Sequence, residues 1–223
     1  SFPLGTAYVA SFAKKQHGND FDFELFKFPE DLAQAVIDRR PKVLAFSNYA
    51  WNLEIGYKIA AWAKEILPDV VIVFGGPNFP TDNMEKEVFL RQRPIIDFYI
   101  ENEGEIGFSN LLTSLKEVDH DTNRLKSSNL SISNCCYINQ DGLVSGKIER
   151  ILDVNQIPSP YLSGMLDKFF DDPLIPMVET TRGCPFSCSF CADGLASKNR
   201  VVRFDPKTTK QELYYVAGKV QDV

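Results

Sequence analysis

Short β-rich runs alternate with longer helical periods from residue 21 to about residue 118, and this alternation constrains the fold more than any other feature. The expected strands are residues 21–28, 43–47, 70–74 and 95–100. Helices are expected to open at Pro29, near Asn52, near Thr81 and near Gly104. Strands that alternate with helices form βαβ units around a parallel sheet. We therefore predict an α/β fold with a Rossmann-like, flavodoxin-type sheet.

Residues 4–15 have the pattern of an amphipathic helix at the start of the sequence. A flavodoxin-type sheet has a strand before that helix, and in the strand order 2-1-3-4-5 this strand is central. The sequence as given has no such strand. We therefore expect either upstream residues in the natural protein or another segment in that position.

The pattern changes after about residue 119. A polar stretch covers residues 119–129, and residues 135–139 and 143–148 then flank Gln140-Asp141-Gly142, which predicts a hairpin with an Asp-Gly turn. Residues 157–160, Ile-Pro-Ser-Pro, suit an extended linker. We predict a Rossmann-like domain with its hairpin over residues 1–150, a linker over 151–172 and the start of a second domain over 173–223.

The composition indicates a globular protein with a small excess of acidic over basic side chains. The chain of 223 residues has 30 acidic and 24 basic side chains, a net charge of −6, and 44% hydrophobic residues, enough for a buried core. No run of lysine and arginine resembles a phosphate-binding stripe, so nucleic acid is not an expected partner. No apolar stretch is long enough to span a membrane, and the start lacks a signal-peptide pattern. We expect a cytoplasmic protein without a membrane partner.

The five cysteines fall into two groups. An odd number without secretion signals argues against a disulfide framework and favours metal or redox chemistry. Cys135 and Cys136 are adjacent in an apolar, strand-like segment, where reduced core cysteines are common. Cys184, Cys188 and Cys191 lie within eight residues of one another, so we place the metal chemistry there.

The three clustered cysteines lie in the sequence TRGCPFSCSFC, residues 181–191. Thiolates at spacings of four and three residues converge on one inorganic centre when the backbone wraps around it, and Gly183 and Pro185 suit such a loop. Three thiolates are one ligand short of a structural zinc site. A cubane iron–sulfur cluster held by three cysteines keeps one iron open for substrate. A zinc site and unliganded thiols are the alternatives.

The motif Cys-x3-Cys-x2-Cys directly after an expected strand, with TRGCPFSC around the first cysteine, resembles the radical S-adenosylmethionine enzymes. The resemblance implies that Cys184, Cys188 and Cys191 bind three irons of a four-iron four-sulfur (4Fe-4S) cluster. It also implies that the fourth iron binds S-adenosylmethionine and that Phe190 contacts the adenine. The family's catalytic domain is a partial TIM-like (β/α) barrel, of which this chain holds the expected first strand, 174–181, and helix, 206–220. The chain alone is therefore expected to be catalytically incomplete.

Ligands of open α/β sheets bind beyond the carboxyl ends of the strands. Three loops follow expected strands; they contain Ser47, Asn48 and Tyr49, then Gly75, Gly76 and Pro77, then Glu101, Glu103 and Gly104. Paired glycines let the backbone approach a large flat ligand, and polar groups can hydrogen-bond its amide side chains. Gly-Gly-Pro is also a common tight turn, and the acidic run also suits a helix N-terminus.

Together with the cysteine loop downstream, this pattern resembles the cobalamin-binding domain that precedes the barrel in one large subclass of radical S-adenosylmethionine enzymes. The helix at residues 4–15, the Gly-Gly-Pro turn, the run Glu103-Gly104-Glu105 and the hairpin occur in the same order. The resemblance implies that the three strand-end loops line the corrin ring and its amide arms. On this interpretation, a valine in place of Gly76 blocks the approach of the ring.

Classical cobalamin domains bind cobalt through the histidine of an Asp-x-His-x-x-Gly motif, and neither His17 nor His120 lies in such a motif. Many members of the radical subclass also lack this histidine. We therefore expect cobalamin without a protein nitrogen on cobalt. Tyr49 and Trp51 are then the bulky side chains available for its lower axial face.

The resemblance implies a cobalamin-dependent radical S-adenosylmethionine enzyme, in which methyl transfer to an unactivated carbon is the commonest reaction. The implied cofactors are a 4Fe-4S cluster, S-adenosylmethionine and cobalamin. The implied partners are a small-molecule or biosynthetic-intermediate substrate and an electron donor such as a flavodoxin or ferredoxin. One alternative is a radical enzyme of another reaction type whose Rossmann-like half is a docking domain. Another is a non-enzymatic iron–sulfur electron-transfer protein.

Overall fold

The computed structural model describes residues 1–189, 191 and 200–220. The chain divides into two compact units. We call Phe26–Arg150 the sheet unit, and Ser1–Leu25 together with Ile151–Val223 the cysteine-loop unit. The first 25 residues group with the C-terminal part, which was not expected, and the domain division given above stays a prediction. No helix among the described residues is long and apolar enough to cross a bilayer.

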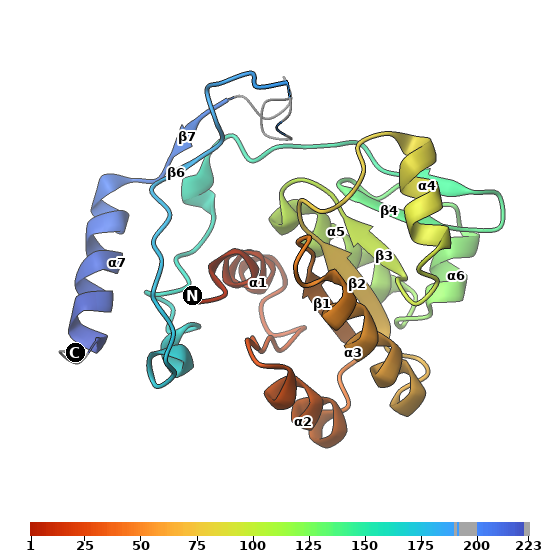
Figure 1. Ribbon diagram of the computed structural model, residues 1–223, viewed down its shortest axis with the longest axis horizontal. Coiled ribbons are helices and arrows are strands. Elements are labelled where there is room, and N and C mark those ends of the chain that lie inside the picture. Colours follow the sequence, from red (N-terminus) through yellow and green to blue (C-terminus); the bar gives the residue numbers. More distant parts are fainter. Residues whose placement is uncertain (190, 192–199, 221–223) are drawn as a thin grey trace. The chain divides into compact units, whose positions relative to one another are not determined.

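The sheet unit is built on a mixed sheet with the strand order β1-β2-β3-β4-β5 (Figure 1). The strands β1 (Val43–Ser47), β2 (Val71–Gly75) and β3 (Phe98–Ile100) are parallel, with Val43 opposite Val71 and Val73 opposite Phe98. The strands β4 (Cys135–Ile138) and β5 (Leu143–Ser145) form an antiparallel hairpin that joins the sheet at β3. The predicted α/β class and the predicted hairpin are therefore confirmed.

Helices connect the strands as expected from their start signals. The helices are α2 (Pro29–Arg39), α3 (Leu53–Ile66), α4 (Asn83–Arg91), α5 (Gly104–Glu117) and α6 (Thr122–Ser127). Pro29 occupies the first turn of α2, where its missing N–H costs nothing. Asp82 caps α4, since its carboxylate accepts hydrogen bonds from the N–H groups of Met84 and Glu85 at 2.9 and 3.2 Å. The short α6 was not expected in the polar stretch; it starts at a similar cap, Asp121.

The core of this unit lies along β2, whose first four residues are at most 1% exposed. A strand that reads as a continuous apolar run is typical of a parallel sheet covered on both faces. Val70, Ile72 and Phe74 belong to one core cluster, which also contains residues of β1, β3, α3 and α4. Burial of each such side chain contributes about 1.5–3 kcal/mol to the hydrophobic stabilisation.

Residues 21–28 were expected to form a strand, and this prediction is wrong. Residues 21–26 have no regular secondary structure, residues 27–28 form a bend, and the segment pairs with no strand of the described residues. Alternate apolar residues of this segment still contact each other, since the ring centroids of Phe21 and Phe23 lie 6.3 Å apart. In the order 2-1-3-4-5 the second strand pairs only with the first. Because the described residues contain no strand before α1, the segment has no partner for a ladder.

The cysteine-loop unit contains α1 (Leu4–His17), the 3-10 helices η1 (Val154–Gln156) and η2 (Asp167–Phe170), the two-stranded β6 (Thr181–Arg182) and β7 (Val202–Arg203), and α7 (Pro206–Lys219). Helix α1 packs on the C-terminal part of the unit: the ring of Tyr8 stacks on Phe204 at 5.5 Å, and the N–H of Phe2 donates to the carbonyl of Ile175 at 3.0 Å. The expected helices at 4–15 and 206–220 are confirmed.

The strand expected over residues 174–181 is mostly wrong. Only Thr181 and Arg182 form β6, and they pair with β7 in an antiparallel ladder. Residues 174–180 have no regular secondary structure, and the backbone of Ile175 and Met177 is bound by groups outside any strand. The Tyr161 hydroxyl donates to the carbonyl of Met177 at 2.7 Å and accepts from its N–H at 3.1 Å. Side-chain hydrogen bonds therefore replace strand pairing along this segment.

Candidate functional site

Two of the predicted loops are tied together at the carboxyl edge of the sheet. Because β1 and β2 are parallel, the loops that follow them leave the sheet at the same edge (Figure 1). The N–H of Asn48 donates to the carbonyl of Gly75 at 2.6 Å, and the N–H of Asn78 donates to the carbonyl of Asn48 at 3.2 Å. The Asn48 side chain is fully buried and donates to the carbonyl of Asn78 at 2.8 Å. The structure thus brings the Asn48 and Gly75–Asn78 loops together as one surface.

Gly76 is required by this contact between loops. Its φ is +132°, which side chains other than hydrogen rarely tolerate. A Cβ placed on Gly76 would stand 2.5 Å from the carbonyl oxygen of Asn48. Gly76 was expected to let a ligand approach, whereas in the structure the Asn48 backbone occupies the space that a Cβ would need. Gly75 is less crowded, since its Cβ would meet Ile100 at 3.3 Å.

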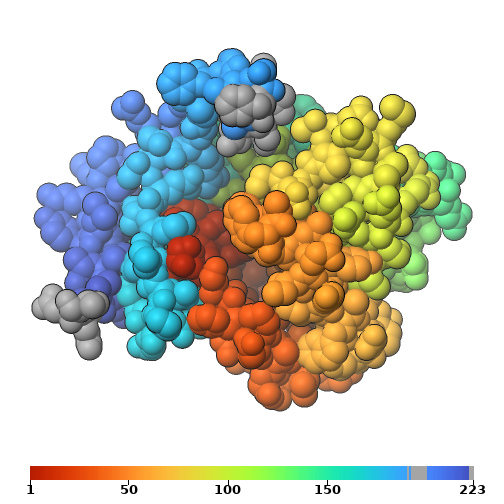
Figure 2. Space-filling view, in the orientation of Figure 1, coloured from red at the N-terminus to blue at the C-terminus, as the bar shows by residue number. Residues whose placement is uncertain are grey.

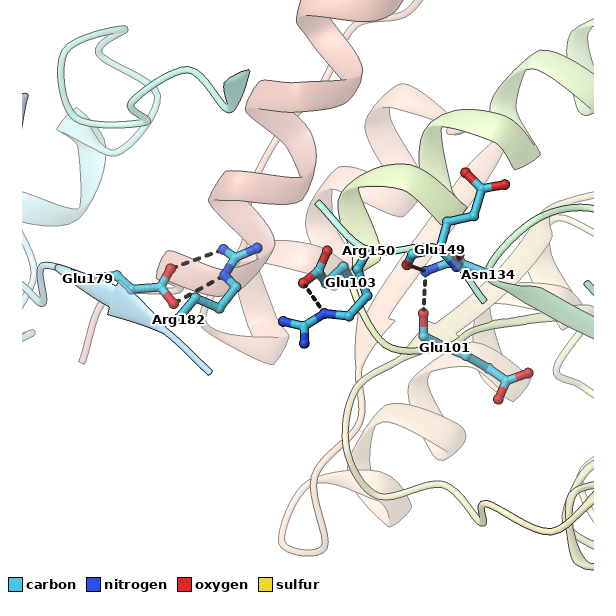
Figure 3. Close-up of polar contacts among 7 residues, drawn as sticks. All are labelled: Glu101, Glu103, Asn134, Glu149, Arg150, Glu179 and Arg182. Atoms are coloured by element: carbon cyan, nitrogen blue, oxygen red, sulfur yellow. Dashed lines mark hydrogen bonds and ion pairs between the residues drawn. The ribbon is translucent and has the colours of Figure 1, made fainter. Parts of the chain in front are cut away.

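The acidic residues of the third loop are engaged within the protein. Glu101 is 9% exposed, and its carboxylate forms an ion pair with Lys86 of α4 at 2.5 Å. The hydroxyl of Ser145 donates to the same carboxylate at 3.4 Å. The Glu103 carboxylate pairs with Arg150 at 3.2 Å (Figure 3), and α5 begins at the next residue, Gly104. These carboxylates therefore hold the loop in place.

Asn134 fastens the Glu101 loop to the end of the hairpin (Figure 3). Its side-chain N–H groups donate to the carbonyls of Glu101 and Glu149 at 3.3 and 2.9 Å, and its side-chain oxygen accepts from the N–H of Glu149 at 2.7 Å. The N–H of Glu101 also donates to the carbonyl of Asn134 at 2.8 Å, so Asn134 binds both backbone groups of Glu101. The third loop is as firmly positioned as the first two.

Tyr49 and Trp51 supply the exposed apolar surface of this edge. Their rings stack at 4.7 Å with 14° between the planes, and Trp51 is 81% exposed. Asn52 holds the loop, because its side chain accepts from the N–H of Tyr49 at 2.7 Å and donates to the carbonyl of Ser47 at 3.0 Å. The segment around residue 50, orange in Figure 2, forms part of the surface. A stacked, exposed aromatic pair of this kind can cover one face of a flat ligand.

The three clustered cysteines lie in the cysteine-loop unit, directly after β6. Cys184 is half-buried, Cys188 and Cys191 are exposed, and Gly183 before them has a φ of +98°. The N–H of Cys191 donates to the carbonyl of Cys188 at 3.2 Å, which makes a tight turn. Among the described residues, no three His, Cys, Asp or Glu side chains are grouped closely enough to hold a metal ion. The assignment of these cysteines as ligands stays a prediction, and Phe190 lies outside the described residues.

The other two cysteines lie in the sheet core. Cys135 and Cys136 are in β4, with 1% and 0% of their surface exposed. Burial raises the pKa of both thiols well above the usual range, with a further contribution from the Glu101 carboxylate. Thiols that stay protonated are poor metal ligands. The structure therefore agrees with the separation of core cysteines from loop cysteines.

An ion pair braces the strand that leads into the cysteine loop. The guanidinium of Arg182 donates twice to the carboxylate of Glu179, at 3.2 and 3.0 Å (Figure 3). It also lies 5.7 Å from the centre of the Tyr8 ring and 6.0 Å from that of Phe204. Two-point pairing of this kind fixes orientation as well as distance. Arg182 thus connects α1, β6 and Phe204, the residue after β7, within this unit.

Tyr99 and Lys86 were not expected at this site from the sequence. Tyr99 is fully buried in β3, and its hydroxyl accepts from the side chain of Asn48 and donates to the carbonyl of Gly76, both at 2.9 Å. A tyrosine in an otherwise apolar buried strand needs a partner for its hydroxyl. That requirement was a signal in the sequence, although the partner was not identifiable from it.

Comparisons with known proteins agree on the class of domain. The family model described as "B12 binding domain" matches residues 1–112. The cobalamin-dependent radical SAM methyltransferase TokK of Streptomyces tokunonensis is 29% identical over 199 residues, covering 84% of this chain and 27% of that protein. The 2-(S-pantetheinyl)-carbapenam-3-carboxylate methyltransferase of Streptantibioticus cattleyicolor is 30% identical over 228 residues, covering 96% of this chain and 32% of that protein.

A solved structure has the same fold. The cobalamin-dependent S-adenosylmethionine radical enzyme OxsB, with aqua-cobalamin and S-adenosylmethionine bound, superposes with a TM-score of 0.68 at 18% sequence identity. The match covers 97% of this chain and 29% of that one. The chain thus spans about a third or less of the length of the proteins that it matches.

Proposed function

The chain belongs to the B12-binding domain family, and from this premise we propose that it binds cobalamin as part of a cobalamin-dependent radical S-adenosylmethionine methyltransferase. The family match over residues 1–112 is the observation that carries the proposal. The names of the relatives support the class of enzyme. The finer parts of the proposal are methyl transfer to an unactivated carbon, a small biosynthetic intermediate as the substrate, a flavodoxin- or ferredoxin-type electron donor and a cytoplasmic location.

The carboxyl edge of the sheet fits a cobalamin. The exposed Tyr49–Trp51 pair offers a flat apolar surface, and it lies directly after Asn48, whose backbone ties the two strand-end loops together. Corrin has a broad apolar face and amide arms, so stacking and backbone hydrogen bonds are the interactions that it requires. In this proposal, the aromatic pair excludes water from one face of the ring and the loops orient the arms.

The donor set of the cysteine loop fits an iron–sulfur cluster with an open iron. Three thiols follow a glycine with positive φ, and Arg182 and Glu179 brace the strand before them. When bound, the cluster would supply the electron that cleaves S-adenosylmethionine, and cobalamin would supply the methyl group. The role of this chain's residues is to hold the cluster by three thiolates and to keep the preceding strand in position.

Titration of the full chain with hydroxocobalamin tests the proposal. We expect saturable binding, read as a shift in the corrin absorbance after unbound cobalamin is removed. A chain whose sheet unit serves only for docking would retain no cobalamin. Retention at one equivalent per chain supports the proposal, and the absence of retention by folded protein contradicts it.

We expect bound cobalamin to have no protein nitrogen on cobalt. Neither histidine lies in an Asp-x-His-x-x-Gly motif, and His17 is the last residue of α1. His120 follows α5, which starts at the carboxyl edge and runs back for 14 residues, about 20 Å, to the opposite edge. His17→Gln and His120→Gln should therefore leave cobalamin binding and the cob(II)alamin paramagnetic resonance spectrum unchanged. Loss of a nitrogen hyperfine pattern in either variant would contradict this assignment.

Trp51→Ala should weaken cobalamin binding without lowering stability. The side chain is 81% exposed, so its removal leaves no cavity in the free protein, whereas stacking on a corrin would bury it. Burial of a large apolar side chain contributes about 2 kcal/mol, which corresponds to a rise in Kd of roughly 30-fold. Ile37→Ala is the matched control, since Ile37 is 51% exposed on α2 and lies away from the strand-end loops. An unchanged Kd in Trp51→Ala would exclude Trp51 from the site.

A further inference from the structure

The hydroxyl of Tyr99 lies where the first two strand-end loops meet. It accepts a hydrogen bond from Nδ2 of Asn48 at 2.9 Å and donates one to the carbonyl of Gly76 at 2.9 Å. Tyr99 itself is 0% exposed in β3, so it cannot touch a ligand at the surface. One buried hydroxyl thus joins β3 to the loop after β1 and to the loop after β2.

Asn48 completes this arrangement. Its Nδ2 donates to the carbonyl of Asn78 at 2.8 Å as well as to Tyr99, and its Oδ1 accepts from the side chain of Asn78 at 3.2 Å. Asn48 is 0% exposed, so both side-chain N–H groups are used inside the protein. A buried network in which every member is satisfied specifies one conformation. The Gly76 turn therefore has one position relative to the Asn48 loop.

Aromatic packing fixes the Tyr99 ring. Phe79 stacks on it at 3.7 Å with 9° between the planes, and Phe89 meets it edge-on at 6.0 Å. Burial raises the pKa of the Tyr99 hydroxyl well above its usual range, which the hydrogen bond from Asn48 partly offsets. The hydroxyl therefore stays protonated and remains a donor to Gly76.

We propose that Tyr99 is a positioning residue of the cobalamin site, whose hydroxyl holds the Gly76 turn against the Asn48 loop so that the two loops present one preformed surface to the ligand. This inference rests on the proposed function, because it concerns the affinity of the same edge for cobalamin. Without the hydroxyl, the carbonyl of Gly76 and one N–H of Asn48 lose their partner. The loops then have to be ordered by the ligand, and binding is weakened by the cost of ordering them.

Tyr99→Phe tests the inference, with Tyr137→Phe as the matched control. Tyr137 is 1% exposed in β4, and its hydroxyl donates to the carbonyl of Leu130 at 2.9 Å. Its ring packs edge-on against Phe98, the neighbour of Tyr99 in β3, and it therefore lies on the opposite face of the sheet. Both substitutions remove one buried hydroxyl and one hydrogen bond to a carbonyl, but only Tyr99→Phe frees the strand-end loops.

We expect Tyr99→Phe to raise the Kd for hydroxocobalamin about 10-fold, since an unsatisfied buried polar group costs on the order of one tenfold step in an equilibrium constant. The circular dichroism of the bound corrin should also change at saturation, because the loops orient the ring. Tyr137→Phe should lower the melting temperature about as much as Tyr99→Phe does, and it should leave both the Kd and the corrin spectrum unchanged. Asn78→Ala, which breaks only the 3.2 Å bond to Asn48, should give a smaller loss of affinity and provides a milder variant if Tyr99→Phe fails to fold.

The outcomes separate this inference from the proposed function. Wild-type affinity in both Tyr99→Phe and Asn78→Ala overturns the inference alone, and so does an equal loss of affinity in Tyr137→Phe. Failure of the folded wild-type chain to bind cobalamin overturns the proposed function and this inference with it.

Discussion

Replacement of Cys184, Cys188 or Cys191 by alanine is expected to abolish the iron–sulfur cluster after anaerobic reconstitution of the full chain. Each thiolate supplies one of the three protein ligands, and two ligands do not hold a cubane with an open iron. Bound iron should fall from about four per chain to nearly none. Iron and sulfide content, together with the paramagnetic resonance spectrum of the reduced protein, measures the loss.

Cys135→Ala and Cys136→Ala are the controls for this experiment. Both side chains are buried in β4, and burial keeps their thiols protonated, so they cannot replace a missing ligand. They should keep the full complement of iron while lowering the melting temperature, because each leaves a small cavity. Loss of the cluster from a control that retains its fold would show that the ligands are wrongly assigned. Addition of S-adenosylmethionine should change the wild-type spectrum, and an unchanged spectrum would favour a cluster without an open iron.

The parts of the fold that depend on local signals were predictable from the sequence. Pro29 starts α2, Asn52 precedes α3 and Gly104 starts α5, as expected. Pro29 acts within the first turn of its helix, whereas α3 and α5 start without a side-chain cap, so their starts follow the change in hydrophobic pattern. The Asp141-Gly142 turn likewise predicted the hairpin, because the side chain of Asn139 accepts from the N–H groups of both turn residues at 2.9 and 3.0 Å.

Strands were predictable only where a partner follows nearby in the sheet. Val43–Ser47 and residues 70–74 are apolar runs that pair with each other and form β1 and β2, the second shifted by one residue. Residues 21–28 and 174–181 have similar patterns but lack neighbouring strands along most of their length. Alternation of apolar and polar residues fixes an extended backbone, whereas a strand also requires hydrogen-bonding partners that the segment does not contain.

The predicted site differs from the structure in what the side chains do. The sequence placed Asn48, Glu101 and Glu103 on the ligand because they follow strands. In the structure, Asn48 is bound to Tyr99, Glu101 to Lys86 and Glu103 to Arg150. The position of a loop follows from the strand order, but the direction of a side chain depends on partners far away in sequence. Tyr49 and Trp51 stay exposed, since among the described residues no such partner covers them.

Gly76→Ala is expected to lower the free energy of unfolding by about 3 kcal/mol and to abolish cobalamin binding at micromolar concentrations. Two costs add: a non-glycine residue at a strained positive φ costs about 1–3 kcal/mol, and overpacking against a backbone atom costs a similar amount. The added Cβ stands 2.5 Å from the carbonyl oxygen of Asn48, so the two loops must separate. Chemical denaturation and hydroxocobalamin titration measure the two effects.

Gly142→Ala separates the two costs. Gly142 also has a φ of +132°, but the nearest atom to its added Cβ is a side-chain oxygen of Glu87 at 3.5 Å, which is ordinary contact. This variant therefore carries the backbone strain without the collision, and it should lose about 1 kcal/mol and bind cobalamin like the wild type. The differences in free energy of unfolding and in cobalamin affinity between the two variants measure how strongly the site depends on the close approach of the Asn48 loop and the Gly76 turn. Equal stability and equal cobalamin affinity in the two variants would show that this approach contributes nothing to the site.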